Sequence, residues 1–194
     1  MKKFVLGLLA VAALSGCGVR SIPMSRNAVD ASLAEITNQY KRRADLIPNL
    51  VQVVKGYAKH ESSTLQGVTE ARAKATSMTL DPSKATPEQL AAYAQAQGQL
   101  SQALGRLLAV SENYPNLKAD QNFRDLQSQL EGTENRITVA RNRYIETIND
   151  FNNQVSVFPT NITNSLFFHY AKLPQWDLAP EEKKAVEKAP EVKF

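Results

Sequence analysis

Cysteine is almost missing from this sequence, because its 194 residues include a single cysteine, Cys17. One thiol cannot form a disulfide within the chain, and it cannot supply the several thiolates of a structural zinc site. The residues before Cys17 also indicate that a lipid is attached to its thiol. The mature domain is therefore expected to contain no disulfide, no zinc-thiolate site and no catalytic thiol.

Histidine is also scarce, with only His60 and His169 in the chain. A zinc metalloprotease helix needs two histidines one turn apart, as in His-Glu-x-x-His. His60 and Glu61 begin such a motif, but Thr64 stands where the second histidine is needed. Di-iron carboxylate bundles need a glutamate three residues before each histidine, and neither histidine has one. The sequence therefore predicts no bound metal ion and no other cofactor.

The common catalytic and nucleotide-binding motifs are absent too. There is no Gly-x-Ser-x-Gly, no glycine-rich phosphate loop and no dinucleotide fingerprint. The formal net charge is +4, and removal of residues 1–16 with their two lysines lowers it by two, to +2. So small a surplus does not favour nucleic-acid binding. These absences predict a protein that is not an enzyme and has no nucleic-acid partner.

The N-terminus carries an export signal. Lys2 and Lys3 precede an apolar stretch, residues 4–14, that is too short to span a bilayer. The following Leu14-Ser15-Gly16-Cys17 resembles the lipobox of bacterial lipoproteins, which predicts cleavage before Cys17 and its lipidation. The alternative is an ordinary signal peptide with a coincidental cysteine.

Several acyl chains on one residue would anchor the protein stably in a membrane. The absence of Asp after the cysteine favours the outer membrane of a bacterial envelope over the inner one. The expected location is therefore a membrane-anchored lipoprotein that faces the periplasm.

Apolar residues recur at helical spacing from Ser25, a plausible N-cap, as far as Val68. Pro48 interrupts this pattern, because proline lacks a backbone donor and crowds the preceding turn. The apolar phase continues across Pro48, which favours a kinked helix, although a split into two helices stays open. No alternating run of β-branched residues competes with this interpretation.

Two further long helices and a short one follow. Thr86-Pro87-Glu88-Gln89 has the order of an N-cap, an N1 proline and a capping-box glutamine. From Phe123 to Val155 apolar residues alternate in steps of three and four, as in a coiled-coil seam. Residues 162–170 could form a short fourth helix.

The predicted fold is an all-α, elongated antiparallel bundle of three long helices plus a short fourth one. The predicted domains are a lipoprotein signal peptide at 1–16, the lipidated cysteine and a tether at 17–24, and the helical bundle at 25–172. The remainder, 173–194, is rich in Pro, Glu, Lys and Ala and is expected to be a flexible tail.

Charged and polar residues near Pro48 form a candidate interaction patch. Its members are Arg42, Arg43, Asp45, Asn49, His60 and Glu61. The plainer interpretation is a solvated face or ion pairs between helices. Any of these charges that points inward needs a partner, because an unpaired buried charge is costly.

Several stretches resemble the LemA family. They include Arg42-Arg43-Ala44-Asp45-Leu46-Ile47-Pro48-Asn49-Leu50-Val51, then Leu130-Glu131-Gly132-Thr133-Glu134-Asn135-Arg136-Ile137, and the closing Ala189-Pro190-Glu191-Val192-Lys193-Phe194. The resemblance implies a long helical bundle at a membrane and supplies no activity. Many members resemble single-pass proteins with an uncleaved N-terminal helix, whereas the lipobox here predicts a lipid anchor instead.

The leading functional hypothesis is a lipid-anchored, non-enzymatic bundle that binds other envelope proteins or serves as a scaffold for them. One alternative is an enzyme with an unrecognised site where Arg43, Asp45 and His60 converge. Another is a purely structural rod at the membrane. The sequence leaves the partner and the oligomeric state open.

Overall fold

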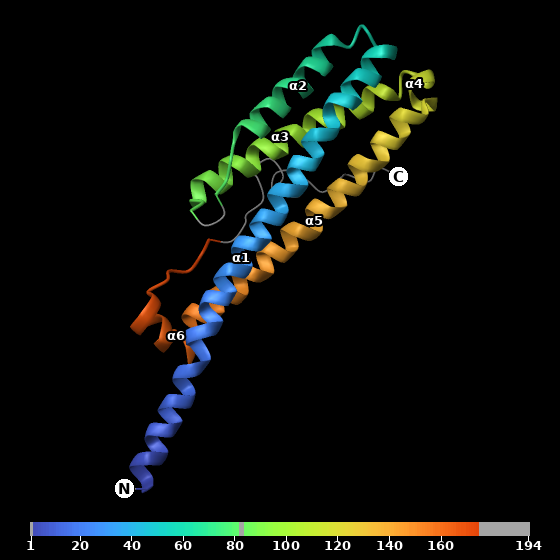
Figure 1. Ribbon diagram of the computed structural model, residues 1–194. Helices are drawn as coiled ribbons and strands as arrows, with labels where there is room; N and C mark the ends of the chain where they lie inside the picture. The colour runs from blue at the N-terminus through green and yellow to red at the C-terminus, as the bar shows by residue number, and fades with distance from the viewer. Residues whose placement is uncertain (1, 82–83, 175–194) are drawn as a thin grey trace, which may run out of the picture. The chain divides into compact units, whose positions relative to one another are not determined.

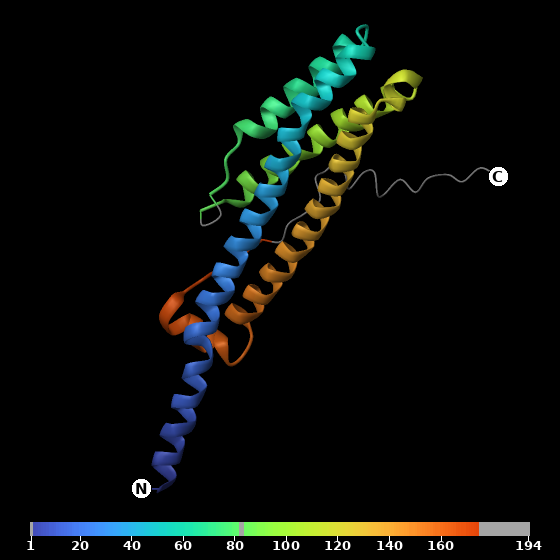
Figure 2. The ribbon, with the colours of Figure 1, turned by 45° about the vertical axis from the view of Figure 1, so that its right-hand side comes forward.

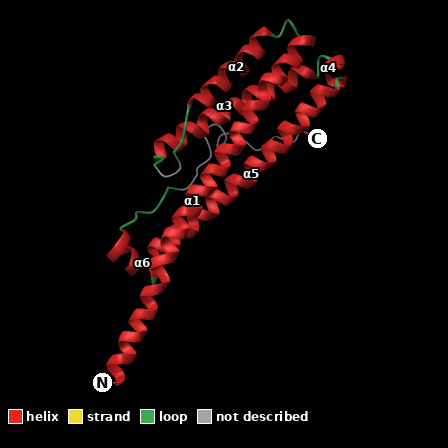
Figure 3. Cartoon of the chain, viewed as in Figure 1, coloured by secondary structure: helices red, strands yellow, loops and turns green. Residues whose placement is uncertain are grey.

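The computed structural model describes residues 2–81 and 84–174. In these residues the chain forms α-helices and one π-helix, and it forms no β-strand (Figure 3). The elements are α1 (Lys2–Tyr57), α2 (Ser62–Ser77), α3 (Pro87–Ser111), α4 (Pro115–Ala119), α5 (Gln121–Ser156), α6 (Thr160–Thr163) and the π-helix η1 (Asn164–Phe168). The all-α helical bundle predicted from the sequence is confirmed.

The described residues form two compact units. Those up to Ile36 and from Ala140 onward make up unit 1, and those from Thr37 to Val139 make up unit 2. α1 and α5 each contribute one part to both units. Each unit is described by itself below.

Unit 2 consists of the second part of α1, the helices α2, α3 and α4, and the first part of α5. α2 folds back beside α1, and α3 lies along the pair (Figures 1 and 2). The core consists of apolar side chains that recur at steps of three and four along each helix, as expected for packed amphipathic helices. It contains Ile47, Leu50, Val54, Ala58, Leu65, Val68, Ala75, Leu100, Ala103, Leu104, Leu107, Leu117, Phe123 and Leu130.

The prediction of one first helix, interrupted only at Pro48, is wrong. α1 passes through Pro48 and ends at Tyr57, and α2 begins at Ser62 after a short turn. The split therefore comes after Pro48, and the predicted first helix is two helices, α1 and α2. The stretch between Ala58 and Leu65 did not reveal this turn, because the seven-residue step between these two buried residues suits both a continuous helix and a turn.

The predicted start of the next helix is confirmed. Thr86 is the N-cap of α3, where the Gln89 backbone N–H donates to Thr86 Oγ1 at 3.2 Å. In return the Thr86 N–H donates to Gln89 Oε1 at 3.0 Å, which completes the capping box. The predicted third long helix is also present, as α5.

Unit 1 is formed by the first part of α1, the last part of α5, α6 and η1. α1 and α5 run antiparallel here (Figure 1), and Arg143 forms an ion pair with Glu35 at 2.8 Å. Ser32 Oγ and Thr147 Oγ1 share a hydrogen bond of 2.8 Å. The core is again apolar and contains Ile22, Val29, Leu33, Ile36, Ala140, Tyr144, Ile148, Phe151 and Val155.

The expected tether before Ser25 is helical instead, because α1 already includes residues 18–24. Ile22 is fully buried, so this part of α1 packs into unit 1. Ser25 is not an N-cap, since its hydroxyl donates to the Ile22 carbonyl oxygen within the helix. Cleavage before Cys17 stays a prediction.

The fourth helix begins and ends two residues earlier than predicted and is less regular, because its second part is a π-helix. α6 and η1 together cover 160–168, and His169 ends them in the left-handed region with a φ of 56°. Of the predicted flexible tail, residues 175–194 lie outside the described residues.

Candidate functional site

A buried arginine lies at the centre of unit 2. The Arg43 side chain is 2% exposed, and its guanidinium donates four hydrogen bonds. Nη1 donates to Ser101 Oγ at 2.7 Å and to Glu134 Oε2 at 2.9 Å. Nη2 donates to the backbone oxygen of Gln97 at 3.1 Å and to its Oε1 at 2.8 Å. Arg43 thus ties α1 to α3 and α5.

These contacts explain how a charge can be buried here. A guanidinium in an apolar interior is tolerated when its donors are satisfied and an anion is near. Glu134 supplies the anion and is itself half-exposed to water. The ring of Tyr40 adds a cation–π contact, with its centroid 5.0 Å from the guanidinium carbon. Arg43 is therefore an internal crosslink of the bundle through its Nη1 and Nη2 atoms, while its buried Nε has no hydrogen-bond partner among the described residues.

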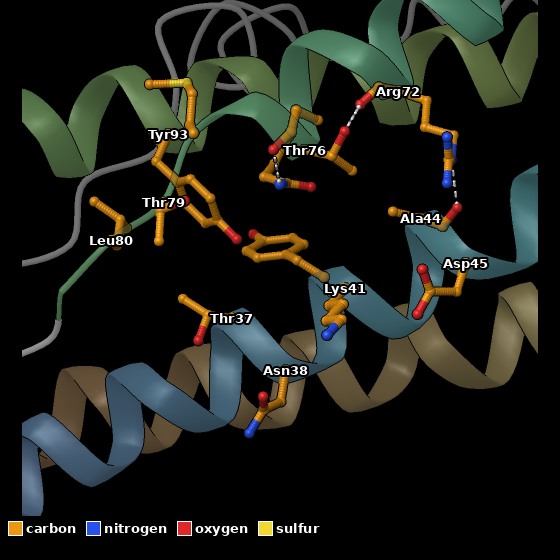
Figure 4. A pocket seen from close by; sticks show the side chains of 14 residues that line it. Thr37, Asn38, Lys41, Ala44, Asp45, Arg72, Thr76, Thr79, Leu80 and Tyr93 are labelled. Atoms are coloured by element: carbon orange, nitrogen blue, oxygen red, sulfur yellow. Dashed lines mark hydrogen bonds between the residues drawn. The ribbon is translucent and has the colours of Figure 1, made fainter.

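Next to Arg43, a pocket of about 490 Å³ opens between α1, α2 and α3. Figure 4 shows Lys41 and Asp45 of α1 on one side, and Thr76 of α2 and Tyr93 of α3 on another. The lining also includes apolar groups and hydroxyls. The full set is Thr37, Asn38, Tyr40, Lys41, Ala44, Asp45, Arg72, Ala75, Thr76, Met78, Thr79, Leu80, Tyr93 and Gln97. The pocket thus offers charges of both signs beside aromatic surface.

Two tyrosines form the aromatic part of this pocket. The rings of Tyr40 and Tyr93 meet edge to face, with centroids 5.6 Å apart. Burial raises the pKa of Tyr93 to about 12. The Tyr93 hydroxyl is therefore protonated at neutral pH and can act as a hydrogen-bond donor, and it cannot act as a base there.

The wall between α1 and α2 contains a hydrogen bond from Arg72. Its Nε donates to the backbone oxygen of Ala44 at 2.8 Å, as the dashed line in Figure 4 shows. In a helix this oxygen would accept the amide of residue 48, but Pro48 has no N–H. Arg72 supplies the missing donor and fixes α2 against α1 at the edge of the pocket.

The structure does not bring all six residues of the candidate interaction patch together on one surface. Arg43 is buried, while Arg42 and Asn49 are exposed on α1, and Asp45 lines the pocket. Tyr57, the last residue of α1, lies about 21 Å along the helix from Arg43 at a rise of about 1.5 Å per residue, and His60 is exposed in the turn beyond it. The predicted convergence of Arg43, Asp45 and His60 is therefore wrong.

Glu61, the last member of the patch, belongs to the turn end of unit 2. It accepts a hydrogen bond of 3.1 Å from the Tyr114 hydroxyl. A second bond joins the same end, from the Tyr57 hydroxyl to Asp120 Oδ2 at 2.8 Å. These bonds raise the pKa of both tyrosines, because each carboxylate favours the protonated hydroxyl. Glu61 thus links the turn before α2 to α4.

Two features are absent from the described part of the chain. Among these residues, no three His, Cys, Asp or Glu side chains lie close enough to hold a metal ion. Within the same ranges, no helix is both long and apolar enough to cross a membrane.

Sequence reasoning missed the pocket residues Lys41, Arg72 and Tyr93. One signal was present, since the donor missing at Pro48 leaves the Ala44 oxygen in need of a partner. Nothing in the sequence indicated that Arg72 would supply it, because that contact depends on the unpredicted turn before α2.

The fold and site define a class of protein: an antiparallel helical bundle with a buried arginine crosslink and a mixed-charge pocket. Residues 32–194 match the model of the LemA family, and the chain belongs to that family. This confirms the resemblance seen in the sequence. A curated relative, Protein LemA of Metamycoplasma hominis, is 25% identical over 136 residues, which are 70% of this chain and 58% of that protein. Neither name states an activity.

Proposed function

We propose that this protein is a lipid-anchored, non-enzymatic helical bundle that binds other proteins of the bacterial cell envelope. The observation that carries the proposal is the mixed-charge pocket of unit 2. The Arg43 guanidinium is hydrogen-bonded within the bundle. The pocket, in contrast, presents Lys41 and Asp45, and neither has an ion-pair partner among the described residues.

The chemistry of the pocket suits a segment of a protein. Its two charges lie four residues apart on α1, which places them on one face of the helix. A partner segment with an acidic group for Lys41 and a basic group for Asp45 would be complementary to this face. The rings of Tyr40 and Tyr93 add apolar surface for a side chain between those charges.

Support for the anchor comes from the sequence. The basic start, the short apolar stretch and Leu14-Ser15-Gly16-Cys17 together have the pattern of a lipoprotein signal. A Cys17→Ala variant is expected to leave the membrane fraction of cells. If this variant still fractionates firmly with membranes, the lipid anchor is wrong.

Site-specific crosslinking in intact cells tests the binding function. A photoreactive residue replaces Asn38, which is exposed and lines the pocket, in the otherwise native chain. Asn142, an exposed asparagine of α5 outside the pocket, is the matched control position. We expect a discrete protein adduct from position 38 and none from position 142.

Charge reversal then tests whether the pocket itself makes the contact. Lys41→Glu and Asp45→Lys should each abolish the adduct from position 38 while the fold, followed by circular dichroism, stays intact. Identical adducts from both positions, or adducts with lipid alone, would overturn the proposal. An adduct unaffected by both reversals would show that the pocket does not bind the partner, as expected of a purely structural rod.

A further inference from the structure

Exposed apolar side chains gather in unit 1. Of the ten large apolar residues that are exposed in the described chain, eight lie in residues 19–24 or 157–170. The most exposed are Phe158 at 68% and Leu166 and Phe167 at 66% each. We name Phe158, Ile162, Leu166 and Phe167 the apolar end surface. A concentration of this kind marks a surface that contacts something other than water.

The backbone that carries the apolar end surface is held in place by the side chains of two asparagines, the buried Asn164 and the partly buried Asn152. Asn164 Nδ2 donates to the Val155 and Tyr170 backbone oxygens at 3.3 and 3.0 Å, and Asn164 Oδ1 accepts from the Tyr170 N–H at 3.0 Å. Asn152 makes a matching pair of bonds with the backbone of Leu173, at 2.9 and 2.8 Å. These bonds satisfy polar groups of the segment, so its exposed apolar side chains belong to an ordered structure.

The helix α6, which carries Ile162 of the apolar end surface, contacts the residue after Cys17. Gly18 packs so closely on Thr163 of α6 that an added methyl group would come within 2.6 Å of Thr163 Cβ. Beyond this contact, α1 continues past α6 towards the N-terminus (Figures 1 and 2). A lipid on Cys17 would therefore place a bilayer at the level of α6.

The charge of the surrounding chain suits such a surface. Residues 151–174 contain no Asp or Glu, and neither do residues 18–29. Arg20 and Lys172, in contrast, are exposed cations of these two stretches. Bacterial membranes carry anionic phospholipids, whose headgroups attract basic residues near the surface and repel acidic ones.

We propose that the apolar end surface inserts into the interfacial region of the lipid bilayer, beside the acyl chains on Cys17. This inference rests on the lipid anchor of the proposed function. Aromatic rings and leucine-type side chains are stable at this depth of a membrane, and a second contact strengthens an anchor. It would also fix the orientation of unit 1 on the membrane. A second copy of the chain is the less favoured occupant, because the anchor already brings lipid to Gly18.

Fluorescence quenching in vesicles tests this insertion. The full lipidated chain is reconstituted into vesicles of phosphatidylethanolamine and phosphatidylglycerol, with Phe167→Cys labelled by a polarity-sensitive dye. Because Cys17 is the chain's one cysteine and is acylated in this form, the introduced thiol is the labelling site. Leu166→Cys provides a second probe, and Asn142→Cys on α5 is the control.

We expect the probes at 166 and 167 to emit at shorter wavelength and to be quenched several-fold more by brominated acyl chains than the probe at 142. Equal quenching at all three positions would overturn the insertion. A short-wavelength emission that lipid does not quench and that disappears on dilution would identify a second copy as the occupant, and would also overturn it.

Mass spectrometry of the Cys17 peptide separates the two proposals. An unmodified Cys17 overturns the lipid anchor whatever the probes report. A modified Cys17 with water-exposed probes at 166 and 167 overturns only the insertion.

Discussion

Arg72 Nε donates a hydrogen bond of 2.8 Å to the backbone oxygen of Ala44, the acceptor that Pro48 leaves without a helical donor. A proline in a helix interior costs about 3 kcal/mol, in part through this lost bond. The side chain of a neighbouring helix here replaces the missing amide. The backbone hydrogen bond that α1 lacks at Pro48 and the packing of α2 on α1 are therefore linked through Arg72.

Removal of Arg72 should expose this dependence. Arg72→Ala leaves the carbonyl of the buried Ala44 without a donor, and we expect a loss of about 1–3 kcal/mol in the free energy of unfolding. Pro48→Ala restores an amide at position 48, so the same substitution should cost less in that background. Denaturant unfolding of the four proteins of this cycle measures the coupling.

Arg42→Ala, at an exposed arginine of α1, is the control and should change stability by less than about 0.5 kcal/mol. Equal losses in both backgrounds would contradict this role of Arg72.

Arg43 should behave as a structural crosslink. Arg43→Lys keeps the charge but cannot reproduce the fork of bonds to Gln97, Ser101 and Glu134, and we expect it to lose about 2–4 kcal/mol of stability. Glu134→Gln keeps a hydrogen-bond acceptor but removes the anion of the buried Arg43, so we expect a loss of about 1–3 kcal/mol, moderated because Glu134 is half-exposed and water can replace part of its interaction. Both values follow from denaturant unfolding. A fully stable Arg43→Lys protein would show that the bonds of the guanidinium do not hold the bundle together.

The sequence predicted those parts of the fold that depend on local pattern. The apolar rhythm from Phe123 to Val155 became α5, and Thr86 to Gln89 became the capping box of α3, because neighbouring residues alone determine such features. The turn between Ala58 and Leu65 was missed because a seven-residue step is compatible with a continuous helix and with a reversal.

The site was harder to predict than the fold. Arg42, Arg43 and Asp45 lie close together in sequence, yet their surroundings differ. Arg43 is buried and Arg42 is exposed, while Asp45 is exposed and lines the pocket. Whether each side chain is buried or exposed depends on the residues of α2 and α3 that pack against it. Those contacts join residues that are far apart in the sequence. His60 was grouped with them by sequence proximity, and the helical rise between them separates it from Arg43.

Asp120 should make the turn end of unit 2 sensitive to acid. The Phe123 N–H donates to Asp120 Oδ1 at 2.9 Å, and this bond, followed by that of the Tyr57 hydroxyl, holds the pKa of Asp120 below its ordinary value. A lowered pKa in the folded state means that the ionised carboxylate stabilises the fold at pH values above the unfolded pKa of about 3.9. This stabilisation disappears as the pH falls through the lower folded value.

The test compares unfolding at neutral pH and below pH of about 4, where the unfolded carboxyl takes up its proton. Asp120→Ala should be less stable than the native protein at neutral pH, and the difference should shrink in acid. Asp120→Asn keeps an N-cap acceptor for α5 and should lose mainly the pH dependence. Asp125→Asn, in the same helix, is the control. A stability difference for Asp120→Ala that is constant across this range would contradict the electrostatic contribution.

The contact of Gly18 with Thr163 should tolerate no side chain. Gly18→Ala would place a methyl group 2.6 Å from both Thr163 Cβ and Oγ1, so α6 would have to move away from α1. Overpacking of this kind costs about 1–3 kcal/mol. Gly132→Ala is the matched control in α5, because its methyl group meets only Arg136 Nη1 at an ordinary 3.7 Å. Alanine is the better helix former by about 0.5–1 kcal/mol, so this control should stabilise the protein.

Thr163→Gly distinguishes a steric clash from other effects of the Gly18 substitution. It removes the atoms that the new methyl group would meet, so Gly18→Ala should cost less in the Thr163→Gly background than in the native one. Denaturant unfolding of the lipidated chain in detergent measures this coupling. Additive losses would mean that α6 does not depend on the absence of a side chain at Gly18. A strong coupling would instead tie the position of the apolar end surface to the residue that follows the lipid attachment.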